Sequence, residues 1–179
     1  MIARWFAYLL ADITMTLLGL VSAPAVVPFA RDGWLPRWLW WFQTPDNSLD
    51  GDHGWQTEHW QWRFKFLAPM ARYIGRVGWL WRNNAYGFST DVLGVKINTS
   101  RFTMLGDANV SNRPLHEGLV RRFFTALNGD RYFQWYYVRA WSSRYCLRIN
   151  LGWKLWGVLT VGESRQFVFS INPFMSYST

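Results

Sequence analysis

The chain has 179 residues, enough for one domain with its own core and an attached segment, but too few for several domains. Its 19 Lys and Arg outnumber its 11 Asp and Glu, which favours anionic partners, either nucleic acid or the headgroups of anionic lipids. The single cysteine, Cys146, excludes an intramolecular disulfide framework and a cysteine-based zinc cluster.

Aromatic residues are unusually frequent, with 14 Trp, 8 Tyr and 13 Phe. Trp and Tyr prefer the boundary between membrane and water, because each carries a polar edge on an apolar ring. The aromatic content therefore favours a lipid bilayer as the partner. Nucleic acid is not expected as a partner, since the sequence has no RNP-type motif.

The segment from Trp5 to Ala30 is apolar apart from Asp12, several hydroxyl groups and two prolines. About 20 apolar residues suffice to cross the core of a bilayer, so we expect a membrane-embedded helix that either spans the bilayer or lies in one leaflet. A buried core helix and a cleaved signal peptide are the alternatives, although Pro24 directly after Ala23 would obstruct cleavage. The carboxylate of Asp12 is costly in hydrocarbon, so we expect it near the interface, paired or protonated.

Residues 31–42 (RDGWLPRWLWWF) interleave tryptophan and arginine after a turn at Asp32-Gly33, a pattern typical of an interfacial anchor. Only Arg4 precedes the apolar segment while several basic residues follow it, so the positive-inside rule places the body of the protein in the cytoplasm. The expected membrane contacts are Arg31, Trp34, Arg37, Trp38, Trp40 and Trp41.

Four of the 11 acidic residues fall within positions 46–58. A divalent metal site formed by Asp46, Asp50 and Asp52 is one hypothesis, since hard cations prefer carboxylate ligands on a flexible loop. Three nearby residues would extend this site to a metal-dependent hydrolase: His53, Glu58 and His59. The alternative is that the acids begin turns and pair with the surrounding arginines. Turn chemistry explains them most simply, so we expect turns and ion pairs first and a metal second.

Apolar residues recur at helical spacing between positions 70 and 81, with two arginines one turn apart on another face. The apolar residues are Met70, Ile74, Val77 and Trp81, and the arginines are Arg72 and Arg76. This pattern predicts a basic, aromatic helix that starts near Pro69. An ordinary surface helix with solvated arginines is the alternative.

The carboxyl half changes to a period of two, which is typical of half-buried strands. Residues 144–156 alternate apolar and polar side chains, and the neighbouring segments 131–141 and 165–171 have a similar composition, with SS and GES as hairpin turns. Residues 91–107 supply one or two further strands. By contrast, residues 115–129 are predicted to form a short helix that ends at a glycine.

These elements predict an α+β fold, in which an N-terminal hydrophobic helix and amphipathic helices precede an antiparallel sheet of four to six strands. One face of the sheet is expected to be apolar, and the other polar with Arg139, Arg148 and Lys154. The expected organisation is a membrane-embedded or interfacial helical segment over residues 1–42, followed by an α+β domain over residues 43–179 with an acidic loop at 43–58.

Catalytic signatures are missing from the sequence, which has no G-x-S-x-G elbow, no Walker loop and no dinucleotide fingerprint. Cys146 falls in a strand pattern, where a small buried thiol is the ordinary interpretation. We therefore expect a non-catalytic protein without a cofactor, apart from the hypothetical divalent metal.

Several strings together resemble a family of small membrane-associated proteins encoded by tailed bacteriophages: WLPRWLWWFQTPDN, LDGDHGW, WLWRNNAYGF, CLRINLGWKL and FVFSINPF. The resemblance covers most of the chain, up to Phe174, and it implies synthesis inside an infected bacterium. It implies no activity and no site residue. We expect an accessory protein at the cytoplasmic face of the host inner membrane, where a host membrane protein is a further candidate partner; a metal-dependent hydrolase and a virion component are the alternatives.

Overall fold

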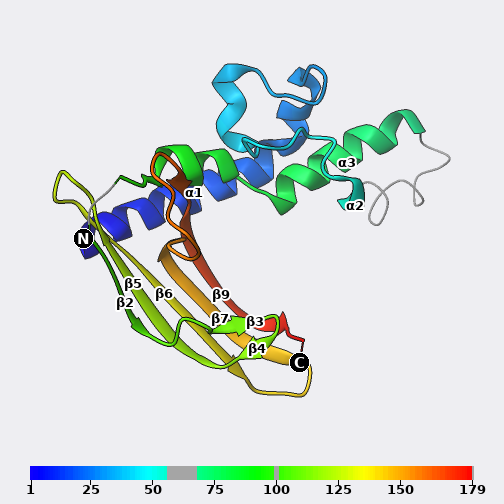
Figure 1. Cartoon of the computed structure of the whole chain (residues 1–179). Coiled ribbons are helices and arrows are strands. Elements are labelled where there is room, and N and C mark those ends of the chain that lie inside the picture. Colours follow the sequence, from blue (N-terminus) through cyan, green and yellow to red (C-terminus); the bar gives the residue numbers. More distant parts are fainter. Residues whose placement is uncertain (56–67, 99–100, 179) are drawn as a thin grey trace. The chain divides into compact units, whose positions relative to one another are not determined.

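A computed structural model describes residues 1–55, 68–98 and 101–178 of the chain (Figure 1). The chain forms two compact units, which we name the sheet unit (Met1–Ala7 and Leu93–Thr179) and the helical unit (Tyr8–Val92). The predicted α+β class is confirmed, with helices first and an antiparallel sheet after them. The boundary expected after residue 42 falls inside the helical unit.

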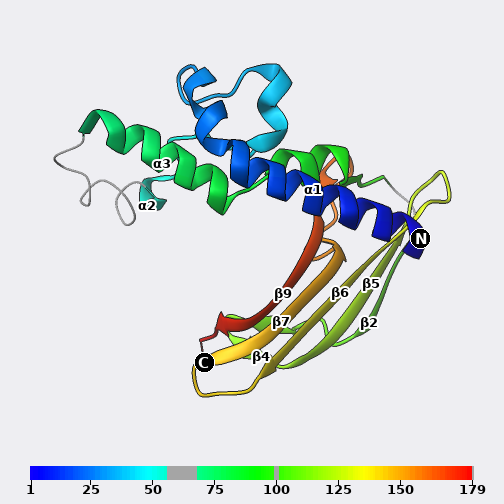
Figure 2. The same ribbon diagram turned by 180° about the vertical axis from the view of Figure 1, so that it is seen from behind.

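The helical unit contains most of α1 (Ile2–Val26), the helix predicted from the apolar run, and α3 (Ala68–Arg82), which starts beside Pro69 as expected. Figure 2 shows α1 and α3 side by side. Four short elements complete the unit: η1 (Val27–Phe29), η2 (Arg37–Phe42), α2 (His53–Trp55) and η5 (Phe88–Val92). Both helices and the segment between them build the core, which consists of Ala23, Val26, Val27, Leu35, Leu39, Phe42, Leu49, Trp55, Val77, Trp79 and Leu80.

The apolar face of α3 differs in part from the prediction. Val77 is buried and Ile74 is half-buried, but Met70 and Trp81 are exposed. The buried face is completed by Leu80 instead. Periodicity thus identified the helix correctly, whereas the partners of each side chain depend on segments elsewhere in the unit.

The sheet unit is built on a five-stranded antiparallel sheet in the order β2-β5-β6-β7-β9, within the predicted range of four to six strands (Figure 1). The strands are β2 (Arg101–Gly106), β5 (Gly118–Thr125), β6 (Arg131–Ala140), β7 (Tyr145–Trp153) and β9 (Phe167–Ser176). Two short pairs flank the sheet: β1 (Val95–Lys96) with β8 (Ser164–Arg165), and β3 (Ser111–Asn112) with β4 (Leu115–His116).

Two predictions in this half were wrong. The helix expected over 115–129 is replaced by β4 and β5, because Val120, Arg122 and Phe124 alternate as the buried positions of a strand. Gly129 does end the segment, but in the turn to β6, where its φ is 84°. The SS connector lies between β6 and β7 as expected, whereas the GES connector belongs to a longer connection that contains β8.

The two faces of the sheet are assigned from the strand register. The apolar face carries Leu119, Trp135, Tyr137, Ile149, Leu151, Phe169 and Ile171. The other face, which we name the polar face, carries Arg122, Gln134, Tyr136, Arg148, Asn150 and Ser170, and beside them the buried apolar residues Val120, Val138 and Cys146. Arg139 was expected on the polar face but pairs with Leu147 on the apolar face, while Arg148 pairs with Val138. Strand alternation alone forces this separation, because Arg139 and Val138 are adjacent residues.

Burial also differs between the faces. Trp135, Phe169 and Ile171 on the apolar face are 46 %, 41 % and 56 % exposed, whereas Gln134 and Asn150 on the polar face are buried. The start of α1 covers one part of the apolar face, where Trp5 packs against Phe133, Phe167 and Phe169. The polar face also holds a hydrophobic cluster, in which Val110 from the segment before β3 packs against Val120, Val138 and Cys146 of the strands. Polar side chains on this face are therefore buried together with apolar ones.

Candidate functional site

Helix α1 carries a stripe of exposed apolar side chains. They recur every three or four positions and therefore lie on one face: Ile2, Phe6, Leu10, Ile13, Leu17 and Val21. Only 28 % of the most apolar 18-residue window between Ile2 and Phe29 is buried, whereas a core helix is buried over most of its surface. At a rise of about 1.5 Å per residue, its 25 residues match the roughly 30 Å thickness of a hydrocarbon core.

Two prolines leave two backbone carbonyls near the end of α1 without their usual helical donors. Pro24 has no N–H for the carbonyl of Leu20, and Pro28 has none for the carbonyl of Pro24. Side chains of α3 fill both positions: Trp81 Nε1–H donates to the Leu20 carbonyl at 2.9 Å, and the Tyr73 hydroxyl donates to the Pro24 carbonyl at 2.8 Å. Helix α3 thus completes the hydrogen bonding of α1 where proline interrupts it.

A third side chain also reaches α1, from a residue just after the end of α3, and it does so beside a glycine. Asn84 Nδ2 donates to the Thr16 carbonyl at 2.7 Å, and a Cβ on Gly19 would collide with the Asn84 side chain. Gly19 therefore permits the close approach. By helical spacing, Asp12 falls on the same face as Thr16 and Gly19 and away from the exposed apolar stripe.

The predicted turn at Asp32-Gly33 is confirmed. Arg31 and Trp34 exchange two backbone hydrogen bonds of 2.9 and 2.8 Å, and the two central residues have φ values of 49° and 83°. Glycine adopts a positive φ at no steric cost, which explains the Asp-Gly sequence here. The Gly33 carbonyl accepts a hydrogen bond of 2.7 Å from the Leu49 N–H, so the turn is tied to the loop that carries the acidic residues.

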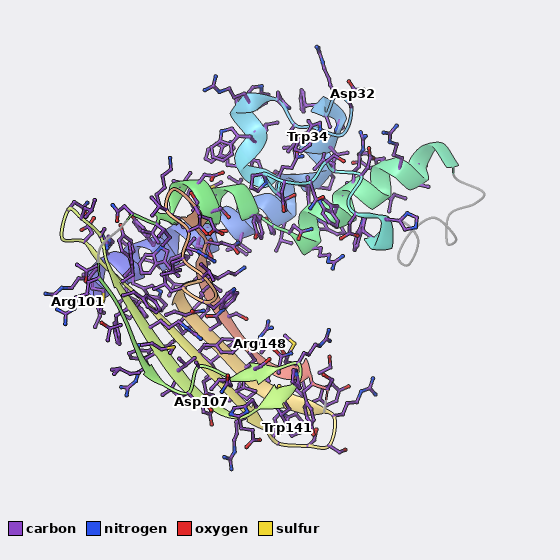
Figure 3. All side chains as sticks on the ribbon, viewed as in Figure 1. Asp32, Trp34, Arg101, Asp107, Trp141 and Arg148 are labelled. Carbon is purple, nitrogen blue, oxygen red and sulfur yellow. The ribbon has the colours of Figure 1, made fainter. Side chains whose placement is uncertain are left out.

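The aromatic anchor predicted over residues 31–42 is partly exposed. Trp38 is 63 % exposed and packs edge-on against Phe29, with ring centroids 5.9 Å apart. Trp34, which Figure 3 labels beside Asp32, is also exposed, and so is Trp40. A groove of about 450 Å³ has Arg31, Trp34 and Trp38 among its lining residues, beside Phe29, Leu35 and Pro36. The exposed rings and this groove form a largely apolar surface that includes one cation, Arg31.

Arg31 and Arg37 are exposed and form no ion pair with any residue that the structure describes. Trp41 differs from the other tryptophans: it is half-buried, its Nε1–H donates to the Trp38 carbonyl at 2.6 Å, and its ring packs against Phe88. Trp41 therefore contributes to the packing of the helical unit, and we restrict the proposed membrane contacts to the other five residues.

Asp50 is held by two arginines of α3. Its Oδ1 accepts from Arg72 Nε at 3.0 Å and from Arg76 Nε at 2.7 Å, while its Oδ2 accepts from Arg72 NH2 at 2.8 Å and from Arg76 NH2 at 2.9 Å. These bonds, first from Arg76 and then from Arg72, hold the pKa of the Asp50 carboxyl well below its usual range. The predicted pairing of the acids with arginine is confirmed at this residue, and neither arginine is merely solvated.

The other members of the acidic window have separate roles. Asp52 Oδ1 accepts a hydrogen bond of 2.6 Å from the Trp55 N–H and so caps the short helix α2. Asp46 is exposed and lies near Tyr86, whose pKa is raised by burial first and by the charge of Asp46 second.

Asp46, Asp50 and Asp52 do not come together as a metal-ligating group. Within residues 1–55, 68–98 and 101–178, no three His, Cys, Asp or Glu side chains are placed to hold a metal ion. The physical reason at Asp50 is that guanidinium donors already occupy both of its oxygens. His53 is exposed, and Glu58 and His59 lie outside the described residues.

Comparison with known proteins places the chain among relatives without assigning an activity. The profile of DUF7338, a family of unknown function, matches residues 1–179. The chain belongs to this family. No curated protein and no solved structure matches it significantly.

Sequence analysis missed the residues that join α3 to α1. Tyr73, Trp81 and Asn84 looked like ordinary members of an aromatic, polar segment. A usable signal was present in the prolines, since Pro24 and Pro28 each free a carbonyl four residues earlier that needs a donor from elsewhere. A cationic cavity in the sheet unit, lined by Arg122, Arg148 and Lys154, was also missed.

Proposed function

We propose that this chain is a non-catalytic, membrane-associated accessory protein that inserts α1 into a bilayer. The observation that carries the proposal is the exposed apolar stripe from Ile2 to Val21 on a helix long enough to cross the hydrocarbon core. Such a surface is unfavourable in water at about 25 cal/mol per Å² of apolar area, and lipid would cover it.

The hydrogen bonds from α3 support the same proposal. An unpaired carbonyl in hydrocarbon costs several kcal/mol, because no water is present to satisfy it. The two carbonyls that proline frees both accept from α3 side chains, at 2.9 and 2.8 Å. A proline-containing helix with these partners is suited to an apolar environment.

The exposed anchor would lie at the headgroups. Trp34, Trp38 and Trp40 offer aromatic rings with a polar edge, and Arg31 and Arg37 offer guanidinium groups for phosphate. These basic residues after α1 favour an orientation with the body in the cytoplasm. Together with the resemblance to phage membrane proteins, this supports the inner membrane of a bacterial host as the location.

Flotation with vesicles tests the proposal. The full chain is mixed with vesicles of phosphatidylethanolamine and phosphatidylglycerol and centrifuged through a density gradient. The parent should float, and a Leu10→Asp/Leu17→Asp variant should stay at the bottom, because an acidic residue near the centre of a membrane helix costs about 2.5 to 3.5 kcal/mol. Leu10 and Leu17 are 67 % and 59 % exposed, so the substitutions leave the packing of the protein itself intact.

The matched control is Leu127→Asp/Val158→Asp, which adds the same charge at residues of the sheet unit that are 69 % and 84 % exposed. It should float like the parent. Equal flotation of the stripe variant and the control would contradict insertion of α1. A parent that stays monodisperse in water without lipid or detergent would also contradict it, and a parent that assembles into particles through the stripe would favour a virion component.

A further inference from the structure

A cavity of about 570 Å³ lies on the polar face of the sheet, and all of its lining residues belong to the sheet unit. Its floor includes one row of the sheet, in which Tyr136, Asn150 and Ser170 stand side by side on β6, β7 and β9. Two segments outside the strands, 108–110 and 154–157, contribute the walls. The volume falls in the range of about 300 to 1,000 Å³ that small-molecule sites occupy.

Hydrogen bonds hold the floor and one wall in place. Gln134 is fully buried; its Nε2 donates to Asn150 Oδ1 at 3.0 Å, and its Oε1 accepts from the Leu155 N–H at 3.1 Å. Arg165 NH1 donates to the Trp156 carbonyl at 3.2 Å and so fixes the segment after β7. The cavity is therefore formed in the protein alone and needs no ligand to shape it.

Three cations line this cavity, namely Arg122, Arg148 and Lys154, and none of its lining residues is acidic. Arg122 is only 7 % exposed, yet its nearest acceptors, Gln134 Oε1 and the Ala108 carbonyl, are both 3.5 Å away, at the outer limit of a hydrogen bond. Arg148, labelled on β7 in Figure 3, has a buried Nε without a hydrogen-bond partner in the described part of the chain. Arg148 also interacts with the Tyr136 hydroxyl. Because each guanidinium carries five N–H donors, both groups retain donors for an anion.

The electrostatics agree with this geometry. Burial lowers the pKa of the Lys154 ammonium, and the charge of Arg148 lowers it further. Burial also lowers the pKa of the Arg122 guanidinium. A buried cation is stable when an opposite charge lies close to it, and the cavity provides space for that charge but no carboxylate.

We infer that this cavity binds a phosphate ester, with Arg122, Arg148 and Lys154 around the phosphate oxygens and Trp156 beside the organic part. Guanidinium groups bind phosphate through paired N–H donors, and the ammonium adds a compact charge. Tyr136 and Ser170 contribute hydroxyl groups to the same floor. Trp156 is 38 % exposed and packs edge-on against Tyr136, with ring centroids 6.0 Å apart, so one apolar wall is available to an organic group.

The phosphate ester has two potential sources, a soluble small molecule or the headgroup of a lipid. The inference concerns the sheet unit alone and does not depend on insertion of α1. Two probes separate the sources: phenyl phosphate represents a soluble ester, and a short-chain phosphatidylglycerol below its micelle concentration represents a headgroup.

Isothermal titration calorimetry of the full chain in an uncharged detergent tests the inference, with chloride keeping the ionic strength constant. Binding of either probe supports the site, and the probe that binds more tightly identifies the source. Arg148→Gln should weaken binding by about tenfold or more, because a charge-assisted hydrogen bond is lost. Lys154→Gln should weaken it in the same direction, and it serves as the second variant if Arg148→Gln does not fold.

Arg139→Gln is the matched control, since Arg139 lies on the neighbouring strand and the opposite face, with a side chain that is 67 % exposed. It removes the same charge from the protein and should bind like the parent. The inference is overturned if neither probe binds the folded parent, or if Arg148→Gln, Lys154→Gln and Arg139→Gln all bind as the parent does.

Discussion

The helical unit and the sheet unit treat buried charge in opposite ways. In the helical unit, Asp50 accepts four hydrogen bonds from Arg72 and Arg76, so its charge is balanced within the chain. In the sheet unit, Arg122 and Arg148 line a cavity that has no acidic residue. A balanced ion pair serves the fold, whereas a buried and a half-buried cation without an acidic residue beside them leave a requirement that a ligand can meet.

This difference separates a charge cluster that stabilises the fold from one that is open to a ligand. The acidic window attracted attention in the sequence because its residues are close together in the chain, yet Asp50 and Asp52 both serve structural contacts of the helical unit. The cations of the cavity are dispersed between positions 122 and 154 and become a cluster only when the sheet forms. Spatial balance of charge, and not density along the sequence, indicates which cluster is open to a partner.

Asp50→Asn should have the largest effect on the helical unit. The substitution leaves the Arg76 side chain, which is only 12 % exposed, without a counter-charge, so we expect a loss of about 3 kcal/mol in the free energy of unfolding. Urea unfolding in mild detergent, followed by tryptophan fluorescence, measures it.

The pH dependence of the same variant provides a second readout. The pKa of Asp50 is lowered in the folded state, so its stabilisation is present above the unfolded pKa of about 3.9 and is lost as the pH falls towards the folded value. The parent should therefore lose more stability than Asp50→Asn when the pH is lowered below about 4. Identical acid profiles would contradict a balanced charge at Asp50.

Arg76→Gln should be the next largest change, with a loss of about 2 kcal/mol, since a partly buried pair is broken and Asp50 keeps only Arg72. Arg72→Gln is the matched control: its side chain is 66 % exposed, so we expect a loss below about 1 kcal/mol. Thermal unfolding of the two variants side by side measures the difference. Equal losses would show that the greater burial of Arg76 does not make its ion pair with Asp50 more stabilising than that of Arg72.

Trp81→Phe tests whether a hydrogen bond between neutral groups also stabilises the helical unit, as the ion pairs of Asp50 do. The change removes the Nε1–H that serves the Leu20 carbonyl while most of the ring stays, so we expect a loss of about 1 kcal/mol. Trp34→Phe, at a similar exposure of 46 % against 49 %, should be nearly neutral. Urea titration in detergent measures both, and a neutral Trp81→Phe would argue against the role of α3 in completing α1.

Arg122→Met should have the smallest effect on stability, although Arg122 is among the most buried charged residues described. Replacing an unbalanced buried cation with an apolar side chain of similar length should change the free energy of unfolding by less than about 1 kcal/mol, with stabilisation as the favoured sign. Phenyl phosphate should raise the melting temperature of the parent but not of this variant. A large loss of stability in Arg122→Met would show that the cation is already balanced within the chain.

The sequence was sufficient for the elements whose pattern is local. The apolar run predicted α1, the spacing of Ile74 and Val77 predicted α3, and the alternation of residues 144–156 predicted β7. The Asp32-Gly33 turn followed from backbone chemistry alone. Each of these features depends on residues within one or two turns of one another.

Features that depend on distant segments were not predictable in the same way. Asp50 meets arginines 22 and 26 positions later, so no spacing rule connected them. Leu147, Ile149 and Leu151 lie on the apolar face that the alternation predicted, but they are only half-buried, while Cys146 and Asn150 on the other face are buried. The helix expected at 115–129 failed for a related reason, because pairing with β2 and β6 selects a strand there.

The first turns of α1 belong to the sheet unit, and this has a consequence for biosynthesis. Arg4 pairs with Asp130 at 2.9 Å, and the Trp5 ring packs against Phe133 and Phe167. A ribosome makes Arg4 and Trp5 well before these partners, at about 5 to 20 residues per second. Under the proposed insertion, α1 would enter a bilayer early in translation, while its opening turn finds its final contacts only after β9 has been made.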